Sequence, residues 1–374
     1  MRTGQQELKQ GVLDAGLCIN CGACVNLCPY TAAYKDRTVI LHGCDLEEGR
    51  CYAYCPRTPT DMETLRRALF EADDLTPELG PFKGLYIARA AEESLRSSAQ
   101  HGGTVTALVT LALEEGLIDA AILAEESERF LPQGAVVTDS AEVKKLSKSK
   151  FVTSPTVAAF NKAAMSAFEK IGVVATPCQA LALAKMRLKP QPATDDRIDK
   201  LSLVIGLFCG WSLSWRGLDK LLRSKADEGS ILGMDIPPSK YECMEVYTTN
   251  GTITIPLEEV LPAVKEGCQF CADMTSEFSD ISVGSARLPE GWDTAKGWNQ
   301  IIVRSKTGQD LLDLAKSRGV LEFRDLPEGN LEKLKRASMN KKRFCVEALI
   351  KKSGAKDNLL YLDPRDPVLS QFIN

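Results

Sequence analysis

Histidine is nearly absent from this 374-residue chain, and no apolar run in it approaches the length of a membrane span. The two histidines, His42 and His101, leave little material for a histidine-based zinc site or a proton relay. A bilayer-spanning helix needs about 18 consecutive apolar residues, so we expect no transmembrane segment. The polar N-terminal stretch has the character of neither a signal peptide nor a lipid anchor. We therefore expect a cytoplasmic protein.

A surplus of charge of either sign is also missing. The 46 Lys and Arg residues are matched by 50 Asp and Glu residues, and the formal net charge is -4. A nucleic-acid-binding protein needs a concentrated basic surface, so we expect no nucleic-acid partner. No segment matches the G-x-G-x-x-G fingerprint convincingly, which leaves a conventional NAD site unsupported. The chain also offers no nucleophile or acid–base pair suited to hydrolysis, so we predict no catalytic side chain.

Cysteine is abundant, with 13 residues, and the first seven lie between positions 18 and 55. Because a cytoplasmic compartment keeps thiols reduced, this density favours metal binding over disulfides. The bacterial ferredoxin run C-x2-C-x2-C-x3-C-P is matched without departure by Cys18, Cys21, Cys24 and Cys28 with Pro29. Two-residue spacers let three thiolates of one tight loop reach three irons of a cubane. The run predicts a 4Fe–4S cluster, and its third cysteine and Cys-Pro ending disfavour zinc.

Three further cysteines, Cys44, Cys51 and Cys55, end in a second Cys-x3-Cys-Pro and indicate an internal duplication. In two-cluster ferredoxins the last cysteine of a run ligates the other cluster. The first cluster would then be held by Cys18, Cys21, Cys24 and Cys55. The second would receive three thiolates, one short of a full set, from Cys28, Cys44 and Cys51.

Three explanations for the short set stay open. The fourth ligand is His42, Asp45 or Glu48, or the cluster is a 3Fe–4S form, or the site is degenerate and empty. We favour a second four-iron cluster with a non-cysteine or distant ligand. Two clusters side by side in one small module would form a path for electrons rather than a catalytic centre.

The predicted organisation has three parts: an α+β ferredoxin-like iron–sulfur module at 1–60, a helical linker at 61–81, and an α/β domain at 82–374. In the last part, short apolar runs alternate with helical patterns, which is typical of a mainly parallel or mixed sheet. Strands are predicted at 84–90, 120–124, 134–137, 171–175, 201–208, 280–283 and 300–303. Helices are predicted at 58–72, 104–116, 156–170, 179–188, 215–226, 308–317 and 331–351. Asn250-Gly251 between two strand-like runs predicts a β-hairpin insertion.

Two groups of residues lie at predicted strand–helix junctions, where ligands bind in α/β sheets. In the first group, Gly102, Gly103 and Thr104 open a helix. Free N–H groups at such a helix start suit a phosphate or a ring carbonyl, although a glycine-rich helix cap has the same pattern.

The second group is made of cysteines. Cys178 and Cys209 each follow a predicted strand, and Cys268 and Cys271 form a C-x2-C pair. Together they suffice for a third cluster or a zinc ion. Each thiol alone is compatible with a buried free cysteine, and the pair is compatible with a dithiol redox site. The last two cysteines have no partner in this pattern and are expected to be structural: Cys243 and Cys345.

The combined elements resemble the coenzyme F420 hydrogenase/dehydrogenase beta-subunit family over about residues 17–303. Besides the ferredoxin-like N-terminus, the resemblance rests on His101-Gly-Gly-Thr-Val-Thr-Ala-Leu, Ala-Thr-Pro-Cys178-Gln, Gly-Leu-Phe-Cys209 and Lys265-Glu-Gly-Cys-x2-Cys-x-Asp. It implies an FAD in the α/β domain and a 4Fe–4S cluster beside it. The implied FAD contacts are Ser98, His101, Gly102, Gly103, Thr104, Thr106, Lys148, Lys150 and Thr176. The implied ligands of the flavin-proximal cluster are Cys178, Cys209, Cys268 and Cys271.

The resemblance also implies an activity: hydride exchange between F420 and FAD, followed by single-electron transfer along 4Fe–4S clusters to other redox subunits of a larger complex. An alternative keeps this relay without F420 and uses ferredoxin, an NAD(P)H-fed module or another acceptor, as in heterodisulfide-reductase-like or formate dehydrogenase complexes. A third hypothesis is a cluster-carrying subunit whose flavin pocket is empty. Many relatives have serine where this chain has His101, so this residue would tune the flavin or mark a different hydride partner.

Overall fold

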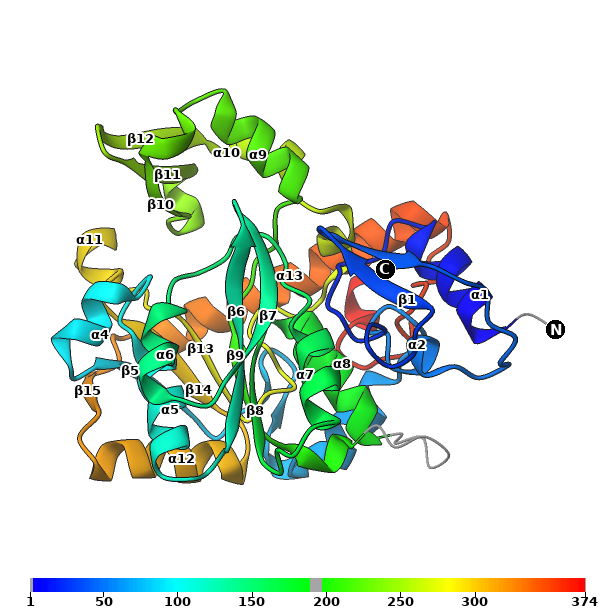
Figure 1. Cartoon of the computed structure of the whole chain (residues 1–374), viewed down its shortest axis with the longest axis horizontal. Coiled ribbons are helices and arrows are strands. Elements are labelled where there is room, and N and C mark those ends of the chain that lie inside the picture. The colour runs from blue at the N-terminus through cyan, green and yellow to red at the C-terminus, as the bar shows by residue number, and fades with distance from the viewer. Residues whose placement is uncertain (1–2, 189–196, 374) are drawn as a thin grey trace.

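The computed structural model describes residues 3–188 and 197–373, and its centre is an eight-stranded mixed sheet (Figure 1). Four neighbouring strands, β13, β9, β8 and β6, are parallel, and antiparallel strands extend the sheet at both edges. In spatial order the strands are β15 (Leu321–Arg324), β5 (Gly84–Ala90), β14 (Asn299–Val303), β13 (Ile281–Ser285), β9 (Leu201–Leu207), β8 (Ile171–Ala175), β6 (Ala120–Glu128) and β7 (Leu131–Val137).

Helices cover both faces of this sheet, because successive residues of a strand point to opposite sides. On β6, Ala121 packs in the core that contains α5 (Thr104–Glu114) and α12 (Lys306–Ser317). Its neighbour Ile122 packs in the core that contains α7 and α8. Besides α5 and α12, the helices around the sheet are α7 (Thr156–Ala164), α8 (Pro177–Leu188), α4 (Glu93–Ser98), α6 (Ser140–Lys145) and α11 (Trp292–Ala295).

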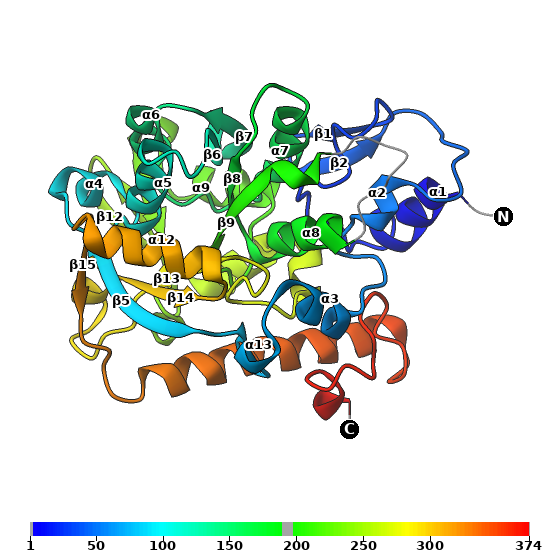
Figure 2. The same ribbon diagram turned by 90° about the horizontal axis from the view of Figure 1, so that it is seen from below.

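The long helix α13 (Asn330–Ser353) passes along the molecule below the sheet (Figure 2). Its end lies near α3 (Met62–Leu69) and the C-terminal segment, and the backbone N–H of Thr60 bonds to the carbonyl of Tyr361 at 3.0 Å. None of the helices in the described ranges is long and apolar enough to cross a membrane.

The N-terminal part is built of short elements. A single π-helical segment, Lys9–Leu13, continues α1, and β1 pairs antiparallel with β2. The elements are α1 (Gly4–Leu8), β1 (Thr31–Tyr34), β2 (Arg37–Ile40) and α2 (Arg50–Ala53), and after α3 come β3 (Leu75–Thr76) and β4 (Gly80–Pro81). The core that contains Leu8 and Cys24 also contains Phe160 of α7 and Leu369. This part therefore shares one core with the helices of the large sheet.

A second, three-stranded sheet stands apart from the first in Figure 1. Thr249 and Asn250 join β11 (Cys243–Thr248) to β12 (Gly251–Pro256) in an antiparallel hairpin, and β10 (Ile231–Asp235) pairs with β11. Its flanking helices are α9 (Trp215–Arg223) and α10 (Leu257–Val260).

Strands β1 to β4 were not predicted from the sequence, and β3 and β4 lie within residues 61–81, which were predicted to form a helical linker. In the α/β domain, β10 and β15 were not predicted either. Both are edge strands, and β15 alternates with charged residues (Glu322 and Arg324), so it has no apolar run to mark it. The prediction of a helix at 156–170 was too long, since α7 ends at Ala164. The Asp119 carboxylate accepts hydrogen bonds from the backbone N–H groups of Glu169 (2.8 Å) and Lys170 (3.1 Å), which holds that segment in a turn before β8.

Candidate iron–sulfur and flavin site

The ferredoxin-type loop is fastened to helix α7 by its backbone. Gly22 has a φ of +90°, and a Cβ there would lie 2.6 Å from the backbone nitrogen of Ala158 and 2.7 Å from the carbonyl oxygen of Pro155. Asn161 of α7 donates to the carbonyl of Val25 at 2.7 Å. Only glycine allows this close approach at this φ. The contacts fix the loop and leave its cysteine side chains for other partners.

The first predicted set of cysteines comes together in one buried region. Burial raises the pKa of Cys21 well above its ordinary value, and the thiols of Cys178, Cys55 and Cys24 raise it further. Burial, followed by Cys18 and Cys55, does the same to the pKa of Cys24. Burial raises the pKa of Cys55 itself to about 12. Thiols this close and this buried stay protonated unless a metal neutralises them.

The second, incomplete set lies nearer the surface. Burial raises the pKa of Cys51 to about 11, and the thiols of Cys28 and Cys44 contribute to the rise. Cys28 and Cys44 are themselves partly exposed. The three side chains considered as a fourth ligand are all exposed: His42, Asp45 and Glu48.

The four later cysteines line one cavity, although they come from three separate parts of the chain. Cys178 is in the first turn of α8, Cys209 follows β9, and the C-x2-C pair spans the 3₁₀ turn Glu266–Phe270. Burial raises the pKa of Cys178 to about 12, and Cys271 is the first neighbour that adds to the shift. The other residues on the cavity wall are Ile19, Arg57, Thr153, Thr176, Pro177, Gly210, Trp211, Ser212 and Asp273.

This donor set fits a 4Fe–4S cluster in its chemistry. All the cysteines are free thiols, and the backbone N–H of Ser212 donates to Sγ of Cys268 at 3.4 Å, the kind of contact that tunes cluster potentials. Among the described residues, no three His, Cys, Asp or Glu side chains form a group suited to one metal ion. A cubane does not need such a group, because each of its thiolates binds a different iron.

The two cysteine regions adjoin each other. The thiol of Cys178 acts on the pKa of Cys21, and a Cβ at Gly267 would lie 2.6 Å from the carbonyl oxygen of Leu17 and 3.0 Å from that of Cys18. The turn that carries the C-x2-C pair therefore packs directly on the ferredoxin-type loop, and an electron would have a short path between clusters at the two sites.

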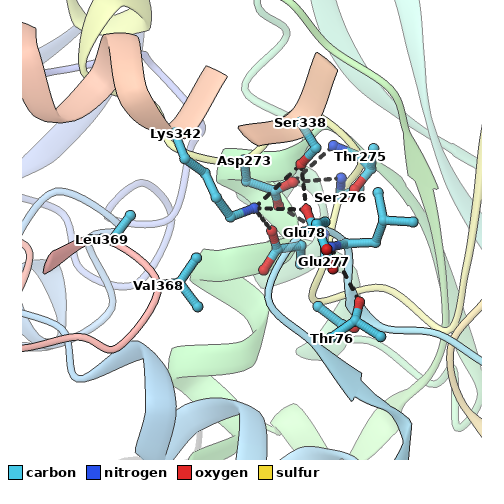
Figure 3. Close-up of polar contacts among 12 residues, drawn as sticks. Thr76, Glu78, Asp273, Thr275, Ser276, Glu277, Ser338, Lys342, Val368 and Leu369 are labelled. Carbon is cyan, nitrogen blue, oxygen red and sulfur yellow. Dashed lines mark hydrogen bonds and ion pairs between the residues drawn. The ribbon is translucent and has the colours of Figure 1, made fainter. Parts of the chain in front are cut away.

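Asp273, the acidic residue of the C-x2-C-x-D motif, holds the chain that follows the pair (Figure 3). Its carboxylate accepts hydrogen bonds from the backbone N–H groups of Thr275 and Ser276 (both 2.9 Å) and of Glu277 (2.8 Å). Burial raises the pKa of Asp273, and the charge of Glu277 raises it further. The motif's aspartate thus lines the cavity and holds the backbone of the segment that follows the C-x2-C pair.

Buried cations neutralise this network, and no sequence pattern indicated them. Lys342 reaches from α13 to the carboxylate of Glu277 (Figure 3). Arg66 bonds to the same carboxylate at 3.1 Å. The side chains of Lys342 and Glu277 are 1% and 2% exposed. Burial opposes ionisation of Glu277, but Lys342 and Arg66 lower its pKa to about 2. These residues lie far apart in the chain, so only the three-dimensional structure shows that they are partners.

The predicted flavin-binding glycines open helix α5 against the sheet. Gly103 precedes the helix with a left-handed φ of 76°. The backbone N–H of Thr104 donates to Oδ1 of Asn299 at 3.3 Å, and its hydroxyl donates to the carbonyl of Ala88 at 3.4 Å. A Cβ at Gly102 would lie 2.8 Å from the same Asn299 oxygen. These glycines allow α5 to approach β5 and β14 closely.

The predicted contacts Ser98, Lys148 and Lys150 lie in one neighbourhood. The hydroxyl of Ser147 donates to the carbonyl of Ser98 at 2.7 Å, which joins the two segments. Lys148 is exposed. Burial lowers the pKa of Lys150, the charge of Glu126 opposes this shift, and the charge of Lys148 adds to it. Thr106 is buried within α5.

Two other predicted contacts lie elsewhere. Thr176 is on the wall of the four-cysteine cavity, and its hydroxyl is 3.3 Å from Sγ of Cys178. Nε2 of His101 is 3.2 Å from Oδ2 of Asp235 on β10, and the imidazole lies edge-on to Trp292 with ring centroids 5.5 Å apart. His101 thereby links the start of α5 to the three-stranded sheet.

Cys345 was expected to be a structural cysteine, and the structure gives it one thiol neighbour. It faces inward from α13, where burial and then the neighbouring thiol of Cys271 raise its pKa to about 12. Arg57, which directly follows the second Cys-Pro, was not considered at all, and it lines the four-cysteine cavity. Its position directly after Cys55-Pro56 was the one sequence feature that could have identified it as a site residue.

The fold and the site define an iron–sulfur oxidoreductase subunit. Residues 12–34 match a family described as 4Fe-4S binding domain. Residues 85–161 match the family described as the N-terminal part of the coenzyme F420 hydrogenase/dehydrogenase beta subunit, and residues 168–329 match the family of its C-terminal part. The chain belongs to this beta-subunit family, which confirms the resemblance drawn from the motifs.

Relatives with assigned roles cover most of the chain. The coenzyme F420 hydrogenase subunit beta of Methanothermobacter thermautotrophicus is 32% identical over 265 residues, which are 68% of this chain and 91% of the relative. One subunit of the F(420)H(2) dehydrogenase of Methanosarcina mazei is 28% identical over 330 residues, 86% of this chain and 88% of the relative. A chain of the F420-reducing [NiFe] hydrogenase complex from Methanosarcina barkeri superimposes with a TM-score of 0.67 at 29% identity, over 74% of this chain and 95% of its own length.

Proposed function

We propose that this chain exchanges hydride with coenzyme F420 at a bound FAD and passes the electrons one at a time, through 4Fe–4S clusters, to other redox subunits. The observation that carries the proposal is the cavity lined by four thiols beside the ferredoxin-type loop. The relatives support F420 as the hydride partner, because their names include it. The neighbouring structure is a multi-subunit complex, which supports a role as one subunit among several.

Bound FAD takes two electrons as hydride and gives them up singly, whereas a 4Fe–4S cluster carries one electron at a time. The flavin-proximal cluster would be held by Cys178, Cys209, Cys268 and Cys271. The next cluster would be held by Cys18, Cys21, Cys24 and Cys55. The outermost would be held by Cys28, Cys44 and Cys51 with a fourth ligand of another kind. The partial exposure of Cys28 and Cys44 supports an exit at that end.

The chain's own residues would bind and orient the flavin between the start of α5 and the loop at 147–150. The Gly102–Gly103 turn before α5 would face the flavin's polar groups, and Lys148 and Lys150 would neutralise its diphosphate. The hydrogen bond between Ser147 and Ser98 supports this arrangement, because it holds the two segments together. Thr176 stands at the boundary with the proximal cluster, beside Cys178.

The test is an anaerobic absorbance spectrum of the purified protein before and after addition of reduced F420. We expect the flavin band and the broad iron–sulfur absorbance to bleach together. In the Cys209→Ser variant the flavin should still bleach, while the iron–sulfur bleaching should be strongly reduced. Cys243→Ser is the control, since Cys243 lies in β11, outside the cavity wall.

Two outcomes would overturn the proposal. If no flavin co-purifies or can be bound, the chain is a cluster-carrying subunit alone. If the flavin stays oxidised with reduced F420 but is reduced by dithionite, F420 is not the donor. A relay supplied by ferredoxin or an NAD(P)H-fed module would then replace it.

A further inference from the structure

Arg57 connects the two cysteine regions. It follows Cys55-Pro56 in the chain, and its backbone N–H donates to Sγ of Cys55 at 3.4 Å. Its side chain extends to the other region, where it forms part of the wall of the cavity lined by Cys178 and Cys271. The residue is 3% exposed. A single buried residue thus contacts the ferredoxin-type module through its backbone and the proposed proximal cluster site through its side chain.

The guanidinium is held rigidly on the C-x2-C turn. It donates to the carbonyl of Phe270 at 2.7 Å and to that of Gly267 at 3.1 Å, the residues that immediately precede the two cysteines of the pair. It also bonds to the hydroxyl of Tyr361 and lies over that ring, 4.9 Å from its centroid. Tyr361 in turn donates to the carbonyl of Phe270. These contacts hold the guanidinium of Arg57 in one position beside the C-x2-C turn.

The charge of Arg57 has no carboxylate partner in the part of the chain that the structure describes. The hydrogen bonds of its guanidinium all go to neutral oxygens, and it is the one cation among the described cavity-lining residues. The nearby Asp273 carboxylate is directed to three backbone N–H groups instead. An uncompensated buried charge is costly. A four-thiolate cluster in the cavity would supply the missing negative charge.

One donor of the side chain is also unused. Nε of Arg57 is buried and has no hydrogen-bond partner among the described residues. Buried donors are almost always satisfied, and hydrogen bonds to sulfur together with net charge are the levers by which a protein sets a cluster's potential. The unpaired Nε therefore lacks an acceptor, and a sulfur atom of a cluster bound in the cavity would supply one.

We propose that Arg57 sets the reduction potential of the cluster held by Cys178, Cys209, Cys268 and Cys271, by placing an unpaired buried cation and a free Nε donor beside it. Reduction adds one electron to the cluster from its donor and breaks no bond. The fixed positive charge stabilises the added negative charge, so the cation raises the potential of this cluster. Electrons from the flavin are thereby drawn to the proximal site. Arg57 is a positioning residue, and the inference rests on the proposed cluster at this site.

The experiment is an anaerobic redox titration with dithionite and mediators, followed by electron paramagnetic resonance, on the full-length holoprotein. Cys268→Ser identifies which signal belongs to the cavity cluster. In Arg57→Gln we expect the equilibrium constant for reduction of that cluster to fall at least tenfold, which is about 59 mV for a one-electron couple. Arg57→Lys keeps the charge and should shift the same cluster by less than half as much.

Arg304→Gln is the matched control. Arg304 is another fully buried arginine that bonds to backbone carbonyls, those of Leu79, Pro81 and Thr275, but it is outside the cavity wall. The Arg304→Gln variant should leave the reduction potential of the cavity cluster unchanged. A normal potential in Arg57→Gln with full iron content, or equal shifts in Arg57→Gln and Arg57→Lys, would overturn the inference. If Arg57→Gln fails to fold, a tenfold shift in Arg57→Lys alone would overturn it.

The titration needs no F420, so it separates this inference from the proposed hydride partner. If Cys268→Ser leaves iron content and every cluster signal unchanged, the cavity holds no cluster. That result would remove the proposed relay and this inference together. Loss of bleaching by reduced F420 with an intact Arg57 effect would remove only the hydride partner.

Discussion

Cys271, which is partly exposed, and the buried Cys345 are neighbouring thiols with different expected roles. Cys271 lines the four-cysteine cavity, whereas Cys345 approaches it from α13 without forming part of the wall. We predict that Cys271→Ser loses the iron and sulfide of one cluster, because serine is a poor substitute for a thiolate ligand. Cys345→Ser should retain full iron and sulfide content. Equal loss in both variants, measured by iron and sulfide analysis of the purified proteins, would contradict this assignment.

The Glu277 carboxylate is the negative centre of the buried network in Figure 3. Removing one member of a buried ion pair typically costs about 3–5 kcal/mol, because the partner charge is left uncompensated. We predict that Glu277→Gln lowers the free energy of unfolding by this amount, measured by urea denaturation. Glu63→Gln is the control, since the Glu63–Arg67 pair is exposed and should change stability by less than about 1 kcal/mol.

The pH dependence of the Glu277 effect follows from the pKa. The native state holds the pKa of Glu277 at about 2, below its ordinary value of 4.5. Its charge therefore stabilises the fold fully above about pH 4.5, and this stabilisation is lost as the pH falls toward 2. The stability difference between wild type and Glu277→Gln should be constant from about pH 8 to pH 6. A difference that already shrinks in that range would show that another group is responsible.

At the scale of elements, the contact between the ferredoxin-type loop and α7 depends on one glycine. Gly22 combines a positive φ with a backbone approach that leaves no room for a Cβ. We predict that Gly22→Ala destabilises the protein by about 1–3 kcal/mol and lowers the iron content of the ferredoxin-type module. Gly11→Ala is the control, because a Cβ at Gly11 would meet nothing within 4 Å. Thermal unfolding and iron analysis of both variants test the prediction, and equal behaviour would contradict it.

The elements that the sequence predicted best are those with a continuous local pattern. The apolar run of β8 and the Asn250-Gly251 hairpin each carry their signal within a few residues. β15 lacks such a run, because charged residues alternate with its apolar ones, and the short apolar run of β10 is interrupted by Gly233. The turn between α7 and β8 is held by a side chain far away in the chain, the Asp119 carboxylate. Long-range contacts of this kind leave no local trace.

At the scale of the whole molecule, the N-terminal module is not packed as an independent unit. Its core residues, such as Leu8 and Cys24, share one cluster with Phe160 of α7 and with Leu369 near the C-terminus. We predict that the ferredoxin-type module and the helices of the large sheet unfold in a single cooperative transition, because neither can lose the shared core alone. Anaerobic denaturation followed by cluster absorbance and by far-UV circular dichroism should give the same midpoint. Two separated midpoints would contradict the prediction.

The sequence by itself determined the iron–sulfur chemistry of the N-terminal loop and the family. Cys18, Cys21 and Cys24 are separated by only two residues each, so the local geometry of one loop can bring them to one cubane. The motifs and the resemblance implied that Cys178, Cys209 and the Cys268–Cys271 pair belong together, and the tertiary structure places them on one cavity wall. Tertiary structure alone decided that Arg57 reaches this cavity from the other module. It likewise decided that Glu277 is paired with Lys342 and Arg66. The reason is physical: a loop fixes distances over a few residues, whereas distant side chains meet only when helices pack on the sheet and bury a common core.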